Sequence, residues 1–218
     1  MKRWLGCTLL ALMVVGCGAP LRPTAPRPLP TGSVEELAAA IAADAKRSDH
    51  EPDSKIRSEL AAEAGRDAEA CLAREPQAAA CLYGRAVALG LEARAHPMRA
   101  GELLNTMLVC LANAEAADPN YDQAGPARVR ALVLIRAPGW PLGPGDAEAG
   151  LVAARRAATL RPQYPPNLLA LAEALAKTGD SNGARQSYEH ARDAAQALPA
   201  TADRDGWLRE ADEALRRQ

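Results

Sequence analysis

The sequence predicts an all-α protein made of stacked helical hairpins, and three observations support this fold class. The chain has 218 residues, 48% of them hydrophobic, which suits one globular domain with its own core. Alanine supplies most of the hydrophobic residues, whereas phenylalanine is absent and aromatic residues make up only 3%. Prolines in turn-like segments recur every 43 residues. Because small side chains let helices approach closely, the core is expected to consist of slender helices in contact.

Residues 1–16 have the features of a lipoprotein signal peptide. Two basic residues precede an apolar run from Trp4 to Val15, which is too short to cross about 30 Å of hydrocarbon as a helix. The run ends in Val14-Val15-Gly16-Cys17, which resembles a bacterial lipobox, whose cysteine receives diacylglycerol before cleavage. We therefore expect lipidation of Cys17 and a stable membrane anchor, since such lipoproteins carry two or three acyl chains. The alternative is an ordinary secretory signal followed by a chance cysteine.

Residues 17–32 form the expected linker between the lipidated cysteine and the folded domain. Five prolines lie between Pro20 and Pro30, a density that prevents a helix and favours an extended polyproline spacer. The residue after Cys17 is Gly18, whereas an aspartate there marks inner-membrane retention in enterobacterial lipoproteins. We therefore expect a periplasm-facing lipoprotein, with the outer membrane favoured over the inner.

Residues 33–218 are expected to form one helical repeat domain. Ser33 and Glu36 make a capping box at the start of the first helix. Pro76, Pro119 and Pro162 are each 43 residues apart, and a tyrosine follows the last two at the same offset. A fixed period of this kind indicates stacked structural units.

The best-formed unit lies between Pro162 and Pro199. Its apolar positions predict two facing helices separated by a turn at Gly179-Asp180: Leu168, Leu171, Ala172 and Leu175 on the first, and Ala184, Tyr188 and Ala191 on the second. This pattern resembles the tetratricopeptide repeat, whose usual period is about 34 residues. The resemblance implies a tetratricopeptide-like helical-hairpin solenoid of three hairpins. The same register predicts helices ending near Ala95, Ala117, Arg136 and Leu160 in the two preceding units.

The middle unit contains an inserted loop, APGWPLGPG, from Ala137 to Gly145. Its three prolines cannot occupy a helix interior, and Asp146 is well placed to cap the helix that follows. Trp140 is one of two tryptophans that remain after removal of the signal peptide. Two hypotheses apply: its ring plugs the end of the solenoid and pins the loop, or it forms part of a ligand or partner surface.

The cysteines suggest one candidate disulfide and no metal site. Cys71 and Cys81 lie five residues on either side of Pro76, so they can face each other across a helical hairpin. The alternative is two small buried thiols. Cys110 is left over and is expected to be buried. The three histidines are isolated, and no cysteine pair has metal-binding spacing.

The concave face of such a solenoid is the candidate binding surface, because repeat proteins present the first helix of each unit there. The proline register assigns these residues to it: Tyr83, Val87 and Leu91, then Arg130, Val133 and Leu134, then Leu169, Glu173 and Lys177. An aliphatic wall with one tyrosine and a few charges suits an apolar ligand with a polar head, or a peptide. The leucines fit equally well as core residues.

Several function classes are disfavoured by the sequence. Phosphate-binding loops, nucleophile elbows and HExxH helices do not occur, so we expect no enzyme activity and no cofactor. The net charge is −1 and becomes −3 once Lys2 and Arg3 leave with the signal peptide. No basic field is therefore present to attract nucleic acid.

The segment from Tyr121 to Asn167 resembles the T-component (TatT) lipoproteins of TRAP transporters. The similar features are the proline-tyrosine turn, the Gly125-Pro126 helix start, the Ala-Pro-Gly-Trp-Pro loop and the Tyr-Pro-Pro-Asn turn. The resemblance covers about residues 56–198 and implies a periplasmic helical-repeat lipoprotein that works with a substrate-binding component. It also implies a pocket or pore for apolar or organic-acid ligands. The alternative is an adaptor lipoprotein that scaffolds a cell-envelope complex; a homo-oligomer is compatible with both.

Overall fold

A computed structural model describes residues 29–217, and the regular structure of this part is helical. One isolated β-bridge, between Gly139 and Gly145, is its only strand-like pairing. The predicted all-α class is therefore confirmed. The signal peptide, Cys17 and the linker as far as residue 28 lie outside the described residues, as does Gln218.

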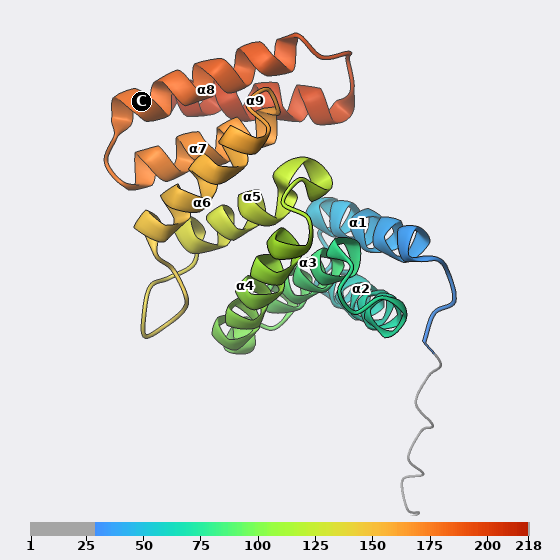
Figure 1. The fold of residues 1–218 in the computed structure, drawn as a ribbon. Coiled ribbons are helices and arrows are strands. Elements are labelled where there is room, and N and C mark those ends of the chain that lie inside the picture. Colours follow the sequence, from blue (N-terminus) through green and yellow to red (C-terminus); the bar gives the residue numbers. More distant parts are fainter. Residues whose placement is uncertain (1–28, 218) are drawn as a thin grey trace, which may run out of the picture.

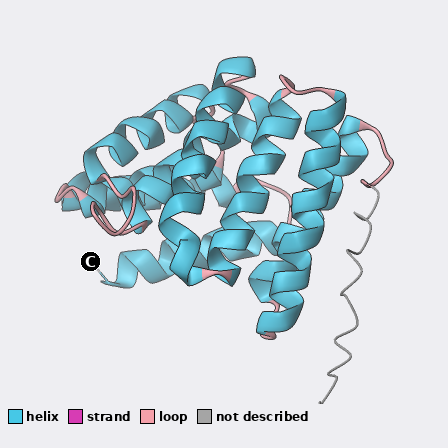
Figure 2. Ribbon diagram, turned by 90° about the horizontal axis from the view of Figure 1, so that it is seen from below, coloured by secondary structure: helices cyan, strands magenta, loops and turns pink. Residues whose placement is uncertain are grey.

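The chain forms nine α-helices and one short 3₁₀ helix between residues 29 and 217 (Figure 1). They are α1 (Val34–His50), α2 (Ser54–Arg74), α3 (Ala79–Ala95), η1 (Pro97–Arg99), α4 (Ala100–Ala117), α5 (Tyr121–Arg136), α6 (Ala147–Leu160), α7 (Pro165–Lys177), α8 (Ser181–Gln196) and α9 (Ala202–Arg217). Each helix packs against the next along the chain, and the odd-numbered helices also contact one another in chain order. In the described part, the backbones of the even-numbered helices do not come close to one another. The odd-numbered helices therefore form one side of the stack. Figure 2 shows the helices of the described part side by side, joined by loops.

The helix ends predicted from the sequence are confirmed. α3, α4, α5 and α6 end at Ala95, Ala117, Arg136 and Leu160. The Ser33 hydroxyl accepts a hydrogen bond from the Glu36 amide at 3.2 Å, and the Glu36 carboxylate accepts one from the Ser33 amide at 2.8 Å. This capping box fixes the start of α1, because the first amides of a helix have no partner within it.

The expected three hairpins, α3–α4, α5–α6 and α7–α8, do not make up the whole stack. The α1–α2 hairpin precedes them and α9 follows them. The proline period does not extend to either end, so the count of three hairpins left out α2 and α9, whereas the Ser33 capping box did predict α1. Gly179, with a φ of 90°, supplies the left-handed residue of the α7–α8 turn.

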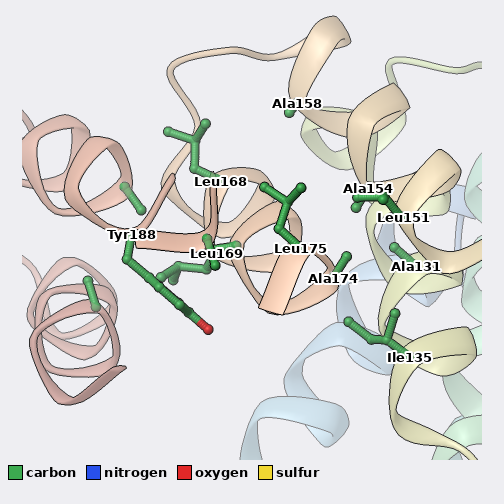
Figure 3. Packing of buried hydrophobic residues seen from close by; sticks show 14 of the residues in the cluster. Ala131, Ile135, Leu151, Ala154, Ala158, Leu168, Leu169, Ala174, Leu175 and Tyr188 are labelled. Carbon is green, nitrogen blue, oxygen red and sulfur yellow. The ribbon is translucent and has the colours of Figure 1, made fainter. Parts of the chain in front are cut away.

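The core is a series of small clusters between successive helices. One lies between α1, α2 and α3, a second between α3, α4 and α5, and a larger one joins α5 to α9. Figure 3 shows the larger cluster, where alanines such as Ala131 and Ala154 lie among leucines. Tyr188 of α8 is its buried aromatic residue within the described part. The disulfide between Cys71 and Cys81 joins α2 to α3 at the start of the stack, with the two Cα atoms 5.2 Å apart.

Gly150 marks the closest approach between α5 and α6. A Cβ atom at this position would lie 2.5 Å from Cγ2 of Ile135 and 3.3 Å from Cβ of Leu134. By contrast, a Cβ atom on Gly65 of α2 would meet nothing within 4 Å. Gly150 therefore permits the close contact between α5 and α6, whereas Gly65 makes no such contact and only lowers the stability of its own helix.

Alanine substitution at these two glycines is expected to change stability in opposite directions. Gly150→Ala should lower the free energy of unfolding by about 1–3 kcal/mol, because the added methyl forces α5 and α6 apart. Gly65→Ala should raise it by up to about 1 kcal/mol through better helix propensity. Urea unfolding followed by circular dichroism measures both. Equal effects of the two substitutions would show that α5 and α6 are not in close contact.

Candidate binding site

The odd-numbered helices bring aromatic and polar side chains together on their shared side. We call this group the inner cluster: Tyr83 of α3, Tyr121, Asp122 and Arg128 of α5, Tyr164 and Asn167 from the start of α7, and Trp207 of α9. Three of the four tyrosines in the chain belong to it. The cluster is therefore where the rare aromatic residues of this sequence are concentrated.

A strained turn lies at the centre of the inner cluster. Asp122, Gln123 and Ala124 have φ angles of 46°, 56° and 64°, so three consecutive residues other than glycine are left-handed. Each such residue costs roughly 1–2 kcal/mol relative to a right-handed conformation. A turn of this kind persists only where the surrounding structure holds it, and such strain is concentrated at functional sites.

Arg128 holds the turn from inside the stack. Its Nη2 donates to Oδ2 of Asp122 at 2.8 Å, and its Nη1 lies 3.2 and 3.4 Å from the carbonyl oxygens of Asp122 and Gln123. Nη1 also donates to Oδ1 of Asn167 at 3.1 Å. The Arg128 side chain is only 11% exposed, whereas that of its partner Asp122 is 42% exposed, so the ion pair is shielded from solvent on the arginine side.

Asn167 completes the support and is itself fully buried. Its Nδ2 donates to the carbonyl oxygens of Gln123 at 2.9 Å and Ala157 at 3.1 Å. One side chain of α7 therefore binds both the left-handed turn, which precedes the regular right-handed part of α5, and the last part of α6. Since a buried amide without partners is costly, its bonds fix the relative positions of all three helices.

The aromatic rings extend the network to both sides of the turn. The Tyr83 hydroxyl donates to Oδ2 of Asp122 at 2.9 Å, and its ring meets Tyr121 edge to face with centroids 5.5 Å apart. On the other side, the Arg128 guanidinium lies 5.4 Å from the centre of the Tyr164 ring. Tyr164 in turn meets Trp207 edge to face at 5.7 Å. Contacts therefore run without a gap from α3 to α9.

Burial and the adjacent Asp122 carboxylate raise the pKa of Tyr83 well above its usual value. Burial also raises the pKa values of Tyr121 and Tyr164. A hydroxyl that donates to a carboxylate keeps its proton, because ionisation would place two negative charges side by side. Tyr83 therefore acts as a hydrogen-bond donor at neutral pH.

A pocket of about 200 Å³ opens beside the cluster, between α5, α7 and α9. It is lined by Arg128, Leu132, Arg136, Pro166, Leu169, Ala170, Trp207 and Glu210. Arg136 forms a two-pronged ion pair with Glu173, with Nε–Oε1 and Nη2–Oε2 distances of 2.8 and 2.6 Å. Burial raises the pKa of Glu210. An apolar wall with guanidinium groups at its edge suits a small molecule that has an aliphatic part and a carboxylate.

Three of the residues predicted for the binding surface lie on this side of the stack. Leu169 lines the pocket although it is largely buried, Glu173 holds Arg136, and Tyr83 bonds to Asp122. Val87 instead packs against the α1–α2 hairpin, in the cluster that contains Ile41. Leu91 belongs to the same core cluster, which agrees with the alternative that the predicted leucines are core residues.

The assignment of Arg130, Val133 and Leu134 to the binding surface was wrong. Arg130 lies 3.8 Å from Glu115 of α4, which also pairs with Arg156 of α6 at 3.5 Å. Val133 packs among residues of α3 and α4, and Leu134 is buried. The proline register counts positions along the chain and does not fix the rotation of α5 about its axis, and in the structure a different face points inward.

The inward residues of α5 are Arg128, Leu132 and Arg136, which the sequence reasoning missed. Their spacing of four residues was the available signal, since residues at i, i+4 and i+8 share one helix face. The choice between this face and the one containing Arg130 depends on helix rotation. Helix rotation depends on contacts with other helices, which the sequence pattern does not reveal.

The hypothesis that the Trp140 ring plugs the end of the solenoid was also wrong, because this side chain is 92% exposed. Cys110 is a free thiol and only half-buried, in contrast to the expected burial. In the described residues, no group of histidine, cysteine and carboxylate side chains could hold a metal ion. Across residues 29–217, none of the helices combines the length and apolar character needed to cross a membrane.

Comparison with the profiles of known protein families and with characterised proteins gives no match. The resemblance to T-component lipoproteins therefore stays a prediction from the motifs of the chain.

Glycine at position 123 is expected to stabilise the protein. The Gln123 side chain is exposed, so Gln123→Gly removes left-handed strain and leaves its carbonyl bonds in place. The free energy of unfolding should rise by about 1 kcal/mol. Gln186→Gly, at an exposed position within α8, is the matched control and should lower it by about the same amount. If both variants are destabilised equally in urea, the turn is not left-handed.

Alkaline pH is expected to destabilise the folded chain through Tyr83. The folded state keeps this proton at pH values where an unfolded tyrosine, with a pKa near 10, releases it. The contribution of Tyr83 to the free energy of unfolding is therefore fully present below pH 10 and is lost as the pH rises beyond it. Tyr83→Phe should reduce the loss between pH 8 and pH 11 by about 1 kcal/mol. Urea titrations at the two pH values test this, and an unchanged loss in Tyr83→Phe would contradict it.

Proposed function

We propose that this chain is a lipid-anchored, periplasm-facing binding protein that serves as an accessory T component of a TRAP-type transport system. Its domain is a tetratricopeptide-like solenoid that binds a small organic acid, or a substrate-binding partner, through the odd-numbered helices. The observation that carries the proposal is the inner cluster. In it, side chains of α3, α5, α7 and α9 gather around a strained turn whose carbonyl groups accept hydrogen bonds, and a pocket lies beside it.

The order of the helices supports a repeat architecture. α3, α5 and α7 begin two or three residues after Pro76, Pro119 and Pro162, so each proline turn precedes the first helix of a hairpin. The core clusters follow one another along the chain, as expected where each repeat contacts only its neighbours. Tyr121 and Tyr164, which share one offset from their prolines, both reach the inner cluster.

The pocket chemistry supports an anionic ligand with an apolar part. Leu132, Leu169 and Trp207 provide apolar contact, and Arg136 keeps one terminal nitrogen outside its bonds to Glu173. A ligand carboxylate can bind this nitrogen or displace Glu173 from the guanidinium. The volume of about 200 Å³ limits the ligand to a small acid.

The role proposed here is binding and delivery. An anchor at Cys17 and an extended linker would hold the domain near the membrane while leaving it free to meet a soluble partner. The rigid turn favours this role, because a binding site that is ordered before the ligand arrives loses less entropy on binding.

Tryptophan fluorescence tests ligand binding directly. The mature chain contains Trp140 and Trp207, so Trp140→Phe leaves a reporter only in the pocket. Titration with three- to six-carbon mono- and dicarboxylates and 2-oxo acids should give a saturable change in emission. Arg136→Ala should weaken binding by at least tenfold because it removes a charge-assisted hydrogen bond. Arg185→Ala, at an exposed arginine of α8, should leave it unchanged.

Failure of every acid to change the emission, with no small molecule retained in native mass spectrometry, would contradict the ligand-binding role. Co-purification of cell-envelope proteins with such an empty protein would favour the adaptor role in its place.

A further inference from the structure

Three large apolar side chains project into solvent where α3 and α5 end. Met98 of η1 is 98% exposed, Trp140 92% and Leu142 77%, and we call them the apolar edge. Met98 and Leu142 line the same shallow hollow, and Leu142 and Trp140 line the next one. Large apolar side chains that are grouped and exposed mark interaction surfaces, and tryptophan is the residue most enriched at their centres.

The loop that carries Trp140 is internally bonded. The Gly145 amide donates to the Pro138 carbonyl at 2.9 Å, and the Leu142 amide donates to the Gly139 carbonyl at 3.0 Å. The loop also rests on α4, since a Cβ atom on Gly101 would lie 3.1 Å from the Leu142 carbonyl oxygen. Trp140 is therefore presented on a closed scaffold, which lowers the entropy lost when a partner binds it.

The charges beside the apolar edge are acidic. Glu102 and Asp146 line the hollow of about 580 Å³ next to Trp140. Arg99, which lines the neighbouring hollow, lies 2.9 Å from Glu92 and 3.9 Å from Glu102, so two carboxylates share its one positive charge. An acidic rim repels an anionic phospholipid surface, and it repels the same rim on a second copy of this chain. It attracts a partner with a basic rim.

The position of the linker also favours a partner away from the membrane. The linker joins the fold at the start of α1, whereas the α5–α6 loop lies at the opposite side of the molecule (Figure 1). α1 alone has 17 residues, or about 25 Å of length, between these sides. A domain tethered at one side therefore presents the apolar edge outward.

We infer that the apolar edge is a docking surface for a protein that offers an apolar socket for the Trp140 indole, surrounded by lysine or arginine. The inference rests on the proposed function for the existence of a partner, and it assigns that partner a surface distinct from the ligand pocket.

Photo-cross-linking in the native cell tests the inference. A benzophenone amino acid replaces Trp140 in the full-length chain, and Gln186 on α8 is the control position. A protein should be cross-linked from position 140 and not from 186, and mass spectrometry identifies it. Calorimetry with this purified protein should then show binding that Trp140→Ala weakens at least tenfold. Glu102→Lys and added salt should also weaken it, whereas Gln186→Ala should not.

Three results would overturn the inference: cross-links only to phospholipid, cross-links only to a second copy, or binding of the purified protein that Trp140→Ala leaves unchanged. Absence of any cross-link from position 140 would overturn it as well. Because Trp140 is exposed, Trp140→Ala should keep the melting temperature close to that of the wild type, which separates binding from folding. The identity of the captured protein is judged separately. A substrate-binding component supports the transport role, and a structural envelope protein supports the adaptor role with the docking surface intact.

Discussion

Close contact between helices through alanine and glycine is the constraint on which the structure depends. Fully buried alanines recur in each cluster, and Gly150 lets α5 and α6 approach more closely than any side chain would permit. Each contact buries little area, so stability comes from many small interfaces in series. A chain built in this way has no central core, and its shape follows from the angles between successive helices.

The inner cluster is where this regular packing gives way to specific polar bonds. The left-handed residues at the start of α5 are unfavourable by themselves. Arg128 and Asn167 hold them in place by binding the carbonyl groups that the turn exposes. Asn167 also binds the end of α6. Its hydrogen bonds offset the conformational free energy of the turn and fix the positions of three helices relative to one another. A small all-α protein thereby obtains one rigid site with a pocket at its edge.

The two candidate surfaces of the molecule differ in construction and in chemistry. The pocket is a recess between helices, with arginines whose charges are balanced by neighbouring carboxylates. The apolar edge is a projecting loop with acidic neighbours. Because the two surfaces are formed by different residues, the proposed ligand and the proposed protein partner would not compete for the same side chains.

The sequence by itself determined most of the helices and their ends, since these depend on local features: the Ser33 capping box, the Asp146 cap, the proline turns and apolar positions that recur every three or four residues. It also indicated the pairing of α2 with α3 through the cysteines. Tertiary structure decided which face of α5 points inward, and hence that Arg128 and Arg136, not Arg130, line the pocket. It likewise decided that Trp140 faces solvent. Helix rotation and loop direction depend on contacts between residues far apart in the chain, such as those of Asn167 with the turn at the start of α5. Local sequence patterns do not predict these contacts.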